Sequence, residues 1–146
     1  MSETTAALKI CMCIDLDPDF YYLIQTYAER SGLHTMYVNR GQDALELARL
    51  QRPVVVFLEG DRPGAFTAWE VLKALKTDQA TRHIPIILFS WIDEGEHALE
   101  EGVDLYVQKP VMYVDFVDAL AVAGVCQESQ DDVAQEKGGA LPRSEG

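Results

Sequence analysis

Residues 54–58 read VVVFL, an unbroken apolar run that follows Pro53 and ends at Glu59. A second apolar run, IPIILF, occupies residues 84–89. Runs of this length are typical of parallel strands, because helices cover such strands on both faces. The two runs therefore predict a sheet that lies at the centre of the molecule.

Shorter apolar runs and helical patterns alternate around these two segments. Further strands are predicted at residues 8–14, 34–38 and 105–107. N-cap and capping-box signals predict helix starts at Asp17–Pro18, at Thr67 with Glu70 and at Asp93 with Glu96. Two more helices are predicted from Ala44 to before Pro53 and from Met112 to Ala123. Five such units predict an α/β fold with one doubly wound, five-stranded parallel sheet and right-handed crossovers.

Functional side chains in a sheet of this kind gather at the carboxyl ends of the strands. Four of the predicted strands are followed there by polar or charged residues. In chain order these edge positions are Asp15, Leu16 and Asp17; Glu59 and Asp61; Ser90 and Trp91; and Lys109, which precedes Pro110.

This ordered set resembles the receiver domain of bacterial response regulators over residues 8–124. That family has an acidic pair after strand one, an aspartate at the end of strand three, Ser or Thr after strand four, and Lys-Pro after strand five. The resemblance implies a flavodoxin-like, or CheY-like, (βα)5 fold. It also implies a role in two-component phosphorelay signalling rather than an enzymatic activity of the chain's own.

Two positions depart from the family pattern. Leu16 occupies the second place of the acidic pair, and an aliphatic side chain cannot bind a cation that prefers oxygen ligands. Glu59 occupies the phosphoacceptor position and is one methylene longer than aspartate. The leading hypothesis is therefore an atypical module, or pseudo-receiver, that needs no cofactor. Its Glu59 carboxylate either imitates the phosphorylated state beside Lys109 or forms only an inert ion pair with it.

Two alternatives remain open. In the first, Asp15, Asp17 and Glu59 assemble an unusual magnesium site and one carboxylate still accepts a phosphoryl group. N-capping is the other role predicted for Asp17. Asp61 falls where the family binds metal through a backbone carbonyl, and it is a weak alternative acceptor. The second alternative, an enzyme or flavin protein on the same sheet, lacks a Gly-rich phosphate loop, a nucleophile elbow and a Cys/His pair.

The resemblance also implies a readout and a partner surface. In the family, the Ser or Thr after strand four moves together with an aromatic residue three positions before the lysine. Ser90 and Tyr106 occupy these positions beside Lys109. The family commonly dimerises or binds targets through the region that corresponds to residues 93–124. The expected partner is accordingly a signalling protein, a second copy of the chain, or both.

Composition sets further limits on function. The chain has 12 basic and 24 acidic residues, a net charge of −12, and no segment rich enough in Lys and Arg to bind nucleic acid directly. Its apolar runs are far shorter than the roughly 20 residues of a membrane-spanning helix, so we expect a cytoplasmic protein. Residues 125–146 lose the apolar pattern, which predicts a disordered acidic tail or a linker.

Cysteine spacing adds one smaller expectation. Cys11 and Cys13 fall on one face of the first predicted strand. Buried, reduced thiols are the simplest interpretation. A Cys-x-Cys metal or redox site is the alternative, although the three histidines are scattered along the sequence.

Overall fold

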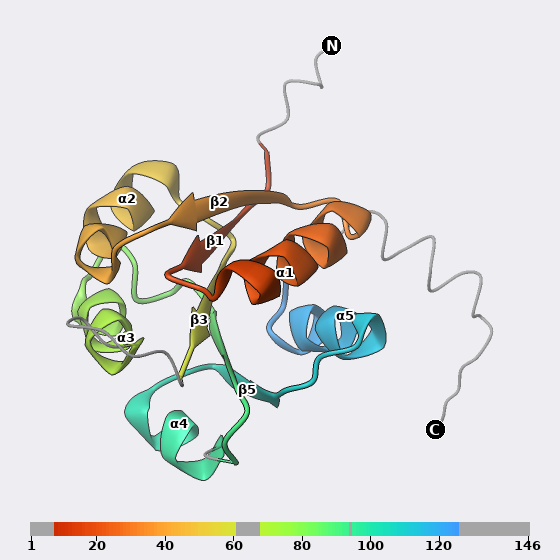
Figure 1. The fold of residues 1–146 in the computed structure, drawn as a ribbon. Helices are drawn as coiled ribbons and strands as arrows, with labels where there is room; N and C mark the ends of the chain where they lie inside the picture. The colour runs from red at the N-terminus through yellow and green to blue at the C-terminus, as the bar shows by residue number, and fades with distance from the viewer. Residues whose placement is uncertain (1–7, 61–67, 94, 126–146) are drawn as a thin grey trace.

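A computed structural model of the protein describes residues 8–60, 68–93 and 95–125, and the predicted fold is confirmed (Figure 1). Within these residues, one parallel sheet has the strand order β2-β1-β3-β4-β5. The strands are β1 Ile10–Ile14, β2 His34–Val38, β3 Val55–Glu59, β4 Ile86–Ser90 and β5 Leu105–Gln108. The helices are α1 Pro18–Arg30, α2 Ala44–Gln51, α3 Ala68–Thr77, α4 Gly95–Glu101 and α5 Tyr113–Val122, with a short 3-10 helix, η2, at Gly41–Asp43.

The sheet separates two apolar cores. Val55 and Phe57 of β3 point into a core shared with α1 and α5, whereas Val56 and Leu58 point into a core shared with α2, α3 and α4. All five residues of β3 are buried as a result. This two-sided burial explains why the VVVFL run contains no polar residue.

Local signals in the sequence fix the ends of the first helix. The Asp17 carboxylate accepts hydrogen bonds from the backbone N–H groups of Asp19 (3.0 Å) and Phe20 (3.2 Å), as an N-cap does. Pro18 is the first residue of α1, where its missing N–H costs nothing. Beyond the helix, Gly32 adopts a φ of +83°, which a glycine accommodates without strain. The N-cap role predicted for Asp17 is confirmed.

Three predictions fall on residues outside the described part of the chain. These are the capping residue Thr67, the acidic residue Asp61, and the tail beyond Val125. Among the residues that the structure does describe, no helix is both long and apolar enough to cross a membrane.

Cys11 and Cys13 are buried free thiols in the core beneath α1 and α5, as the strand spacing predicts. A hydrogen bond with Cys11, together with burial, raises the pKa of the Cys13 thiol well above its ordinary value. Both thiols should therefore resist alkylation by iodoacetamide at pH 8 in the folded protein and react once urea unfolds it. Mass spectrometry of the tryptic peptides measures this, and labelling of Cys13 in the folded state would contradict its protonated, buried state.

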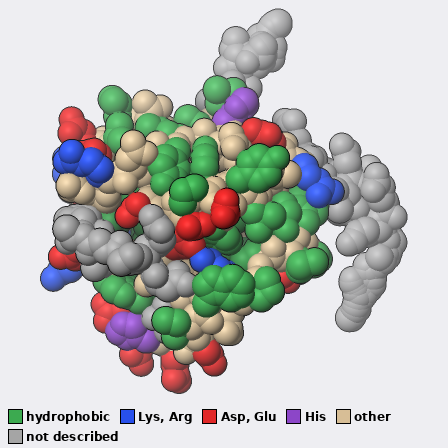
Figure 2. All heavy atoms as spheres, viewed as in Figure 1, with side chains coloured by type: hydrophobic (Ala, Val, Ile, Leu, Met, Phe, Trp, Pro, Cys, Tyr) green, Lys and Arg blue, Asp and Glu red, His purple; other side chains and the backbone are tan. Residues whose placement is uncertain are grey.

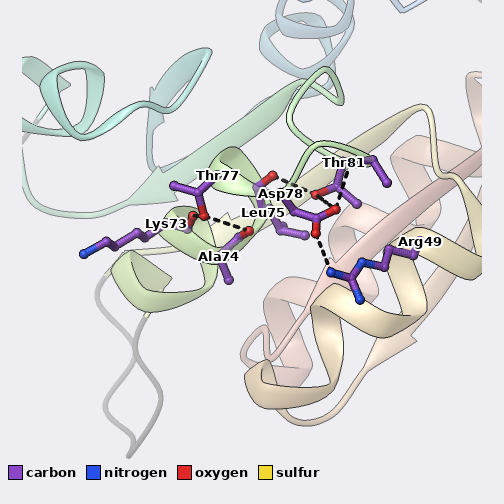
Figure 3. A network of polar contacts seen from close by, with 8 residues as sticks. Arg49, Lys73, Ala74, Leu75, Thr77, Asp78 and Thr81 are labelled. Carbon is purple, nitrogen blue, oxygen red and sulfur yellow. Dashed lines mark hydrogen bonds and ion pairs between the residues drawn. The ribbon is translucent and has the colours of Figure 1, made fainter.

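A polar network joins α2 to the connection between α3 and β4 (Figure 3). The Arg49 guanidinium pairs with the Asp78 carboxylate, whose other oxygen accepts from the Ala80 N–H at 3.0 Å. The buried Thr81 hydroxyl donates to the Leu75 carbonyl at 2.7 Å. This network holds the turn that leads the chain into β4.

The ion pair in this network should make stability depend on pH. A hydrogen bond and ion pair with Arg49 hold the pKa of the Asp78 carboxyl below its ordinary value. The stabilisation is therefore fully present above about pH 4 and is lost as the pH falls through the lower folded-state pKa. Asp78→Asn should lower the urea midpoint at pH 7 and converge with the wild type in acid. Asp118→Asn, at an exposed carboxylate on α5, is the control; an equal deficit at both pH values would contradict the assignment.

Candidate functional site

Glu59 is the last residue of β3, and its carboxylate lies almost fully buried, with 3% of the residue exposed. One oxygen, Oε1, accepts a hydrogen bond from the backbone N–H of Asp17 at 2.6 Å. The other oxygen, Oε2, forms an ion pair with the ammonium group of Lys109. The carboxylate is thus held between the loop after β1 and the residue after β5.

Lys109 is 8% exposed, and aromatic rings flank its ammonium group. Nζ lies 4.4 Å from the ring centroid of Phe20 and 5.7 Å from that of Trp91, both within cation–π range. The Lys109 backbone N–H donates to the carbonyl of Ser90 at 2.8 Å. The peptide bond to Pro110 is cis. The lysine therefore joins the ends of β3, β4 and β5 at one point.

The loop after β1 places its three residues in different environments. Asp15 has a φ of +50°, a left-handed conformation that Asp adopts more readily than most residues. Leu16 is 0% exposed and belongs to the core beneath α1 and α5. The Tyr37 hydroxyl donates to the Leu16 carbonyl at 2.8 Å. Leu16 therefore packs in the core. Its side chain also offers no oxygen ligand to a cation.

The two predicted readout residues meet at the backbone of Ile92. The buried Ser90 hydroxyl accepts a hydrogen bond from the Ile92 N–H at 3.1 Å, and the Tyr106 hydroxyl donates to the Ile92 carbonyl. The Tyr106 ring lies directly against Gly95 at the start of α4, where a Cβ atom would come within 2.9 Å of a ring carbon. Ser90, Tyr106 and Lys109 are thus connected through the chain that follows β4.

Within the part of the site that the structure describes, the side chains are not arranged to hold a magnesium ion. Both Glu59 oxygens already have partners, the Asp17 carboxylate caps α1, and Leu16 supplies no oxygen. Asp15 and Glu59 do line one small cavity, together with Gly41. Among the described residues, no group of three His, Cys, Asp or Glu side chains is arranged to hold a metal ion.

The structure brings Glu59, Ser90 and Lys109 together at the carboxyl edge of the sheet, and Tyr106, which only the family resemblance indicated, is linked to Ser90 through Ile92. Asp61 lies outside the described residues. Sequence reasoning missed the roles of Phe20 and Tyr37. Their only signal was position, since Phe20 opens the first helix and Tyr37 lies near the end of the neighbouring strand.

No protein-family model matches the chain. It is 32% identical over 101 residues to the polar-differentiation response regulator DivK of Brucella anthropi, an alignment that covers 67% of this chain and 81% of the relative.

Solved structures share the fold. The chemotaxis protein CheY4 of Vibrio cholerae superposes with a TM-score of 0.70 at 19% identity, over 79% of this chain and 98% of that one. The signal receiver domain of a signal transduction histidine kinase from Syntrophus aciditrophicus gives 0.69 at 22% identity, over 80% and 92%. At these identities the likeness concerns the fold alone.

Proposed function

The chain belongs to the response-regulator receiver family of two-component signalling, and from that premise we propose that it is an atypical receiver whose Glu59 carboxylate permanently replaces a phosphoryl group. Receiver domains are generally signalling modules that interact with other signalling proteins, such as kinases. In this proposal residues 8–124 form the signalling module. The module works through protein contacts in the cytoplasm, without phosphoryl transfer, a cofactor or nucleic acid.

The buried ion pair between Glu59 and Lys109 carries the proposal. In the family, the lysine balances the negative charge of the phosphoryl oxygens. Here a carboxylate oxygen already reaches that lysine, and the second oxygen accepts the Asp17 N–H. A charge of the required sign is therefore present on every copy of the chain.

The hydrogen-bond pattern supports a connection from this charge to the readout. The Lys109 backbone N–H donates to the Ser90 carbonyl, and the Ser90 hydroxyl accepts from the Ile92 N–H. The Ile92 carbonyl in turn accepts from Tyr106. A shift of the Lys109 backbone would act on both readout residues, because Ser90 and Tyr106 are both bonded to the backbone of Ile92.

Acetyl phosphate labelling tests the loss of phosphoryl transfer. The pure protein is incubated with magnesium and acetyl phosphate, and its intact mass is recorded beside a functional receiver domain treated in the same way. We expect no phosphoryl adduct on this chain and full labelling of the control. A stable adduct that disappears on replacing Asp15, Asp17, Glu59 or Asp61 would support the phosphorelay alternative and identify the acceptor.

A second experiment separates phosphoryl imitation from an inert ion pair. Glu59→Gln keeps the shape of the side chain and removes its charge, so the pull on Lys109 weakens. If the Glu59 charge controls the positions of the readout residues, the amide resonances of Ile92 and Tyr106 should shift in proton–nitrogen NMR correlation spectra. Asp15→Asn, in the same cavity, is the matched control. Shifts limited to the immediate neighbours of Glu59 would contradict phosphoryl imitation and support the inert ion pair.

We also propose the region of residues 93–124 as the contact surface, with a signalling protein or a second copy of the chain as its partner. Tyr106 lies within this region and Trp91 lies just before it in the sequence, and aromatic residues dominate the energetics of many interfaces. Trp91 is largely exposed. The choice between the two partners depends on the shape and charge of this surface.

A further inference from the structure

A groove runs between the outer strand β5 and helix α5. It has a volume of about 390 Å³, and β5 forms one wall with Leu105, Tyr106, Val107 and Gln108. The other wall is α5, with Asp115, Asp118, Ala119 and Val122. Because β5 pairs only with β4 in the described sheet, this wall lies at the sheet's edge. The groove is therefore open to a segment that runs along the strand.

The α5 wall combines two acidic residues, Asp115 and Asp118, with two apolar ones, Ala119 and Val122. Residues 115, 118, 119 and 122 have the spacing of one helix face. Val122 is 71% exposed although it is apolar, and Asp118 is exposed beside it. Val114, four residues before Asp118, is also exposed. The groove thus presents apolar contact area with carboxylates at its rim.

The surrounding surface is strongly acidic. Residues 93–125 contain eight acidic residues and one basic residue, Lys109, so this segment carries seven of the twelve net negative charges. Glu96, Glu100 and Glu101 are exposed on α4, where Figure 2 shows acidic side chains gathered. Lys109 is buried and paired with Glu59. It cannot neutralise this surface for an incoming partner.

From this shape and charge we infer that the groove binds a basic, amphipathic segment of a signalling protein, with Lys or Arg side chains flanking apolar ones. The inference rests on the proposed function and chooses between its two partners. A symmetric dimer through this face would set the same acidic patch, which includes Asp115 and Asp118, against its copy on the other protomer. Like charges opposed at an interface are costly, whereas a basic segment is attracted to the same carboxylates.

Peptide binding to the full-length protein tests this inference. The probe is a fluorescein-labelled peptide of about 14 residues, with leucine and lysine arranged at amphipathic helical spacing. The comparison peptide keeps every lysine and replaces each leucine with serine. Fluorescence anisotropy should show the leucine peptide binding at least about tenfold more tightly. In proton–nitrogen NMR correlation spectra, the leucine peptide should cause the largest amide shifts at residues 105–108 and 115–122.

Charge-reversal variants locate the site. Asp118→Lys should weaken binding of the leucine peptide by about tenfold or more, because it reverses a charge at the groove's rim. Glu46→Lys makes the same change at an exposed position of α2, across the sheet, and should alter binding by less than about twofold. Thermal unfolding of each variant confirms that it is folded.

Three results would overturn the inference. Equal affinity for both peptides, or shifts spread over the whole acidic surface, would mean that charge alone attracts the probe. A dimer of the wild-type chain in sedimentation experiments, dissociated by Asp118→Lys, would make a second copy the occupant. Phosphoryl labelling by acetyl phosphate would instead refute the proposed function and leave the peptide result standing, so the two failures are distinguishable.

Discussion

Lys109→Met is expected to lower the free energy of unfolding by about 3–5 kcal/mol, because it leaves the buried Glu59 carboxylate without its cation. Methionine keeps much of the lysine's length and its contact with Phe20, so the variant removes mainly charge. Glu59 and Lys109 are both almost fully buried, and water cannot replace either partner well. Urea unfolding followed by circular dichroism measures the change.

The double variant Glu59→Gln, Lys109→Met is the control for this result. It removes both charges, so it should recover a large part of the stability that the single Lys109→Met variant loses. Full additivity of the two single variants would show that the groups do not interact. A loss below about 1 kcal/mol for Lys109→Met would mean that the pair behaves as a solvent-exposed one.

Leu16→Ala is expected to lower the free energy of unfolding by about 2–5 kcal/mol, since it opens a cavity in the core beneath α1 and α5. Leu16→Asp, which restores the family's acidic pair in sequence, should cost more, because it places a carboxylate among apolar side chains. Leu50→Ala is the matched control. Leu50 is 71% exposed, so the same truncation there should change stability by less than about 0.5 kcal/mol.

Magnesium extends this test of Leu16. If Leu16 occupies the core as described, magnesium should not raise the melting temperature of the Leu16→Asp variant. A stable Leu16→Asp protein whose melting temperature rises with magnesium would contradict the core role, because ligand binding to the folded state stabilises it. It would also show that one substitution rebuilds a cation site.

The loop after β1 contains both a feature that the sequence predicts and one that it does not. The residues that follow the strands were predicted from chain order alone, and Glu59, Ser90 and Lys109 do meet because parallel strands end at one edge. The inward turn of Leu16 was not predictable in this way. It depends on the left-handed backbone of Asp15 and on the Tyr37 hydrogen bond, and neither has a local signal in the sequence.

The surroundings of Lys109 illustrate the same limit. Trp91 was identified at the sheet edge because it follows Ser90, but its place beside the lysine depends on side-chain packing between two loops. Phe20 reaches the lysine from the first turn of α1, whose orientation is set by the whole core. Sequence patterns predict which residues lie at the carboxyl edge of the sheet. They do not predict which aromatic rings pack against the lysine there.

The covalent nature of the Glu59 charge has a consequence for timing. A phosphorylated aspartate loses its phosphoryl group by hydrolysis, so the active state of an ordinary receiver has a limited lifetime. The Glu59 carboxylate is attached through carbon–carbon bonds and is held by Lys109 and the Asp17 amide in every folded copy. In the proposed function, the strength and duration of the output therefore follow the number of molecules, which synthesis and proteolysis control.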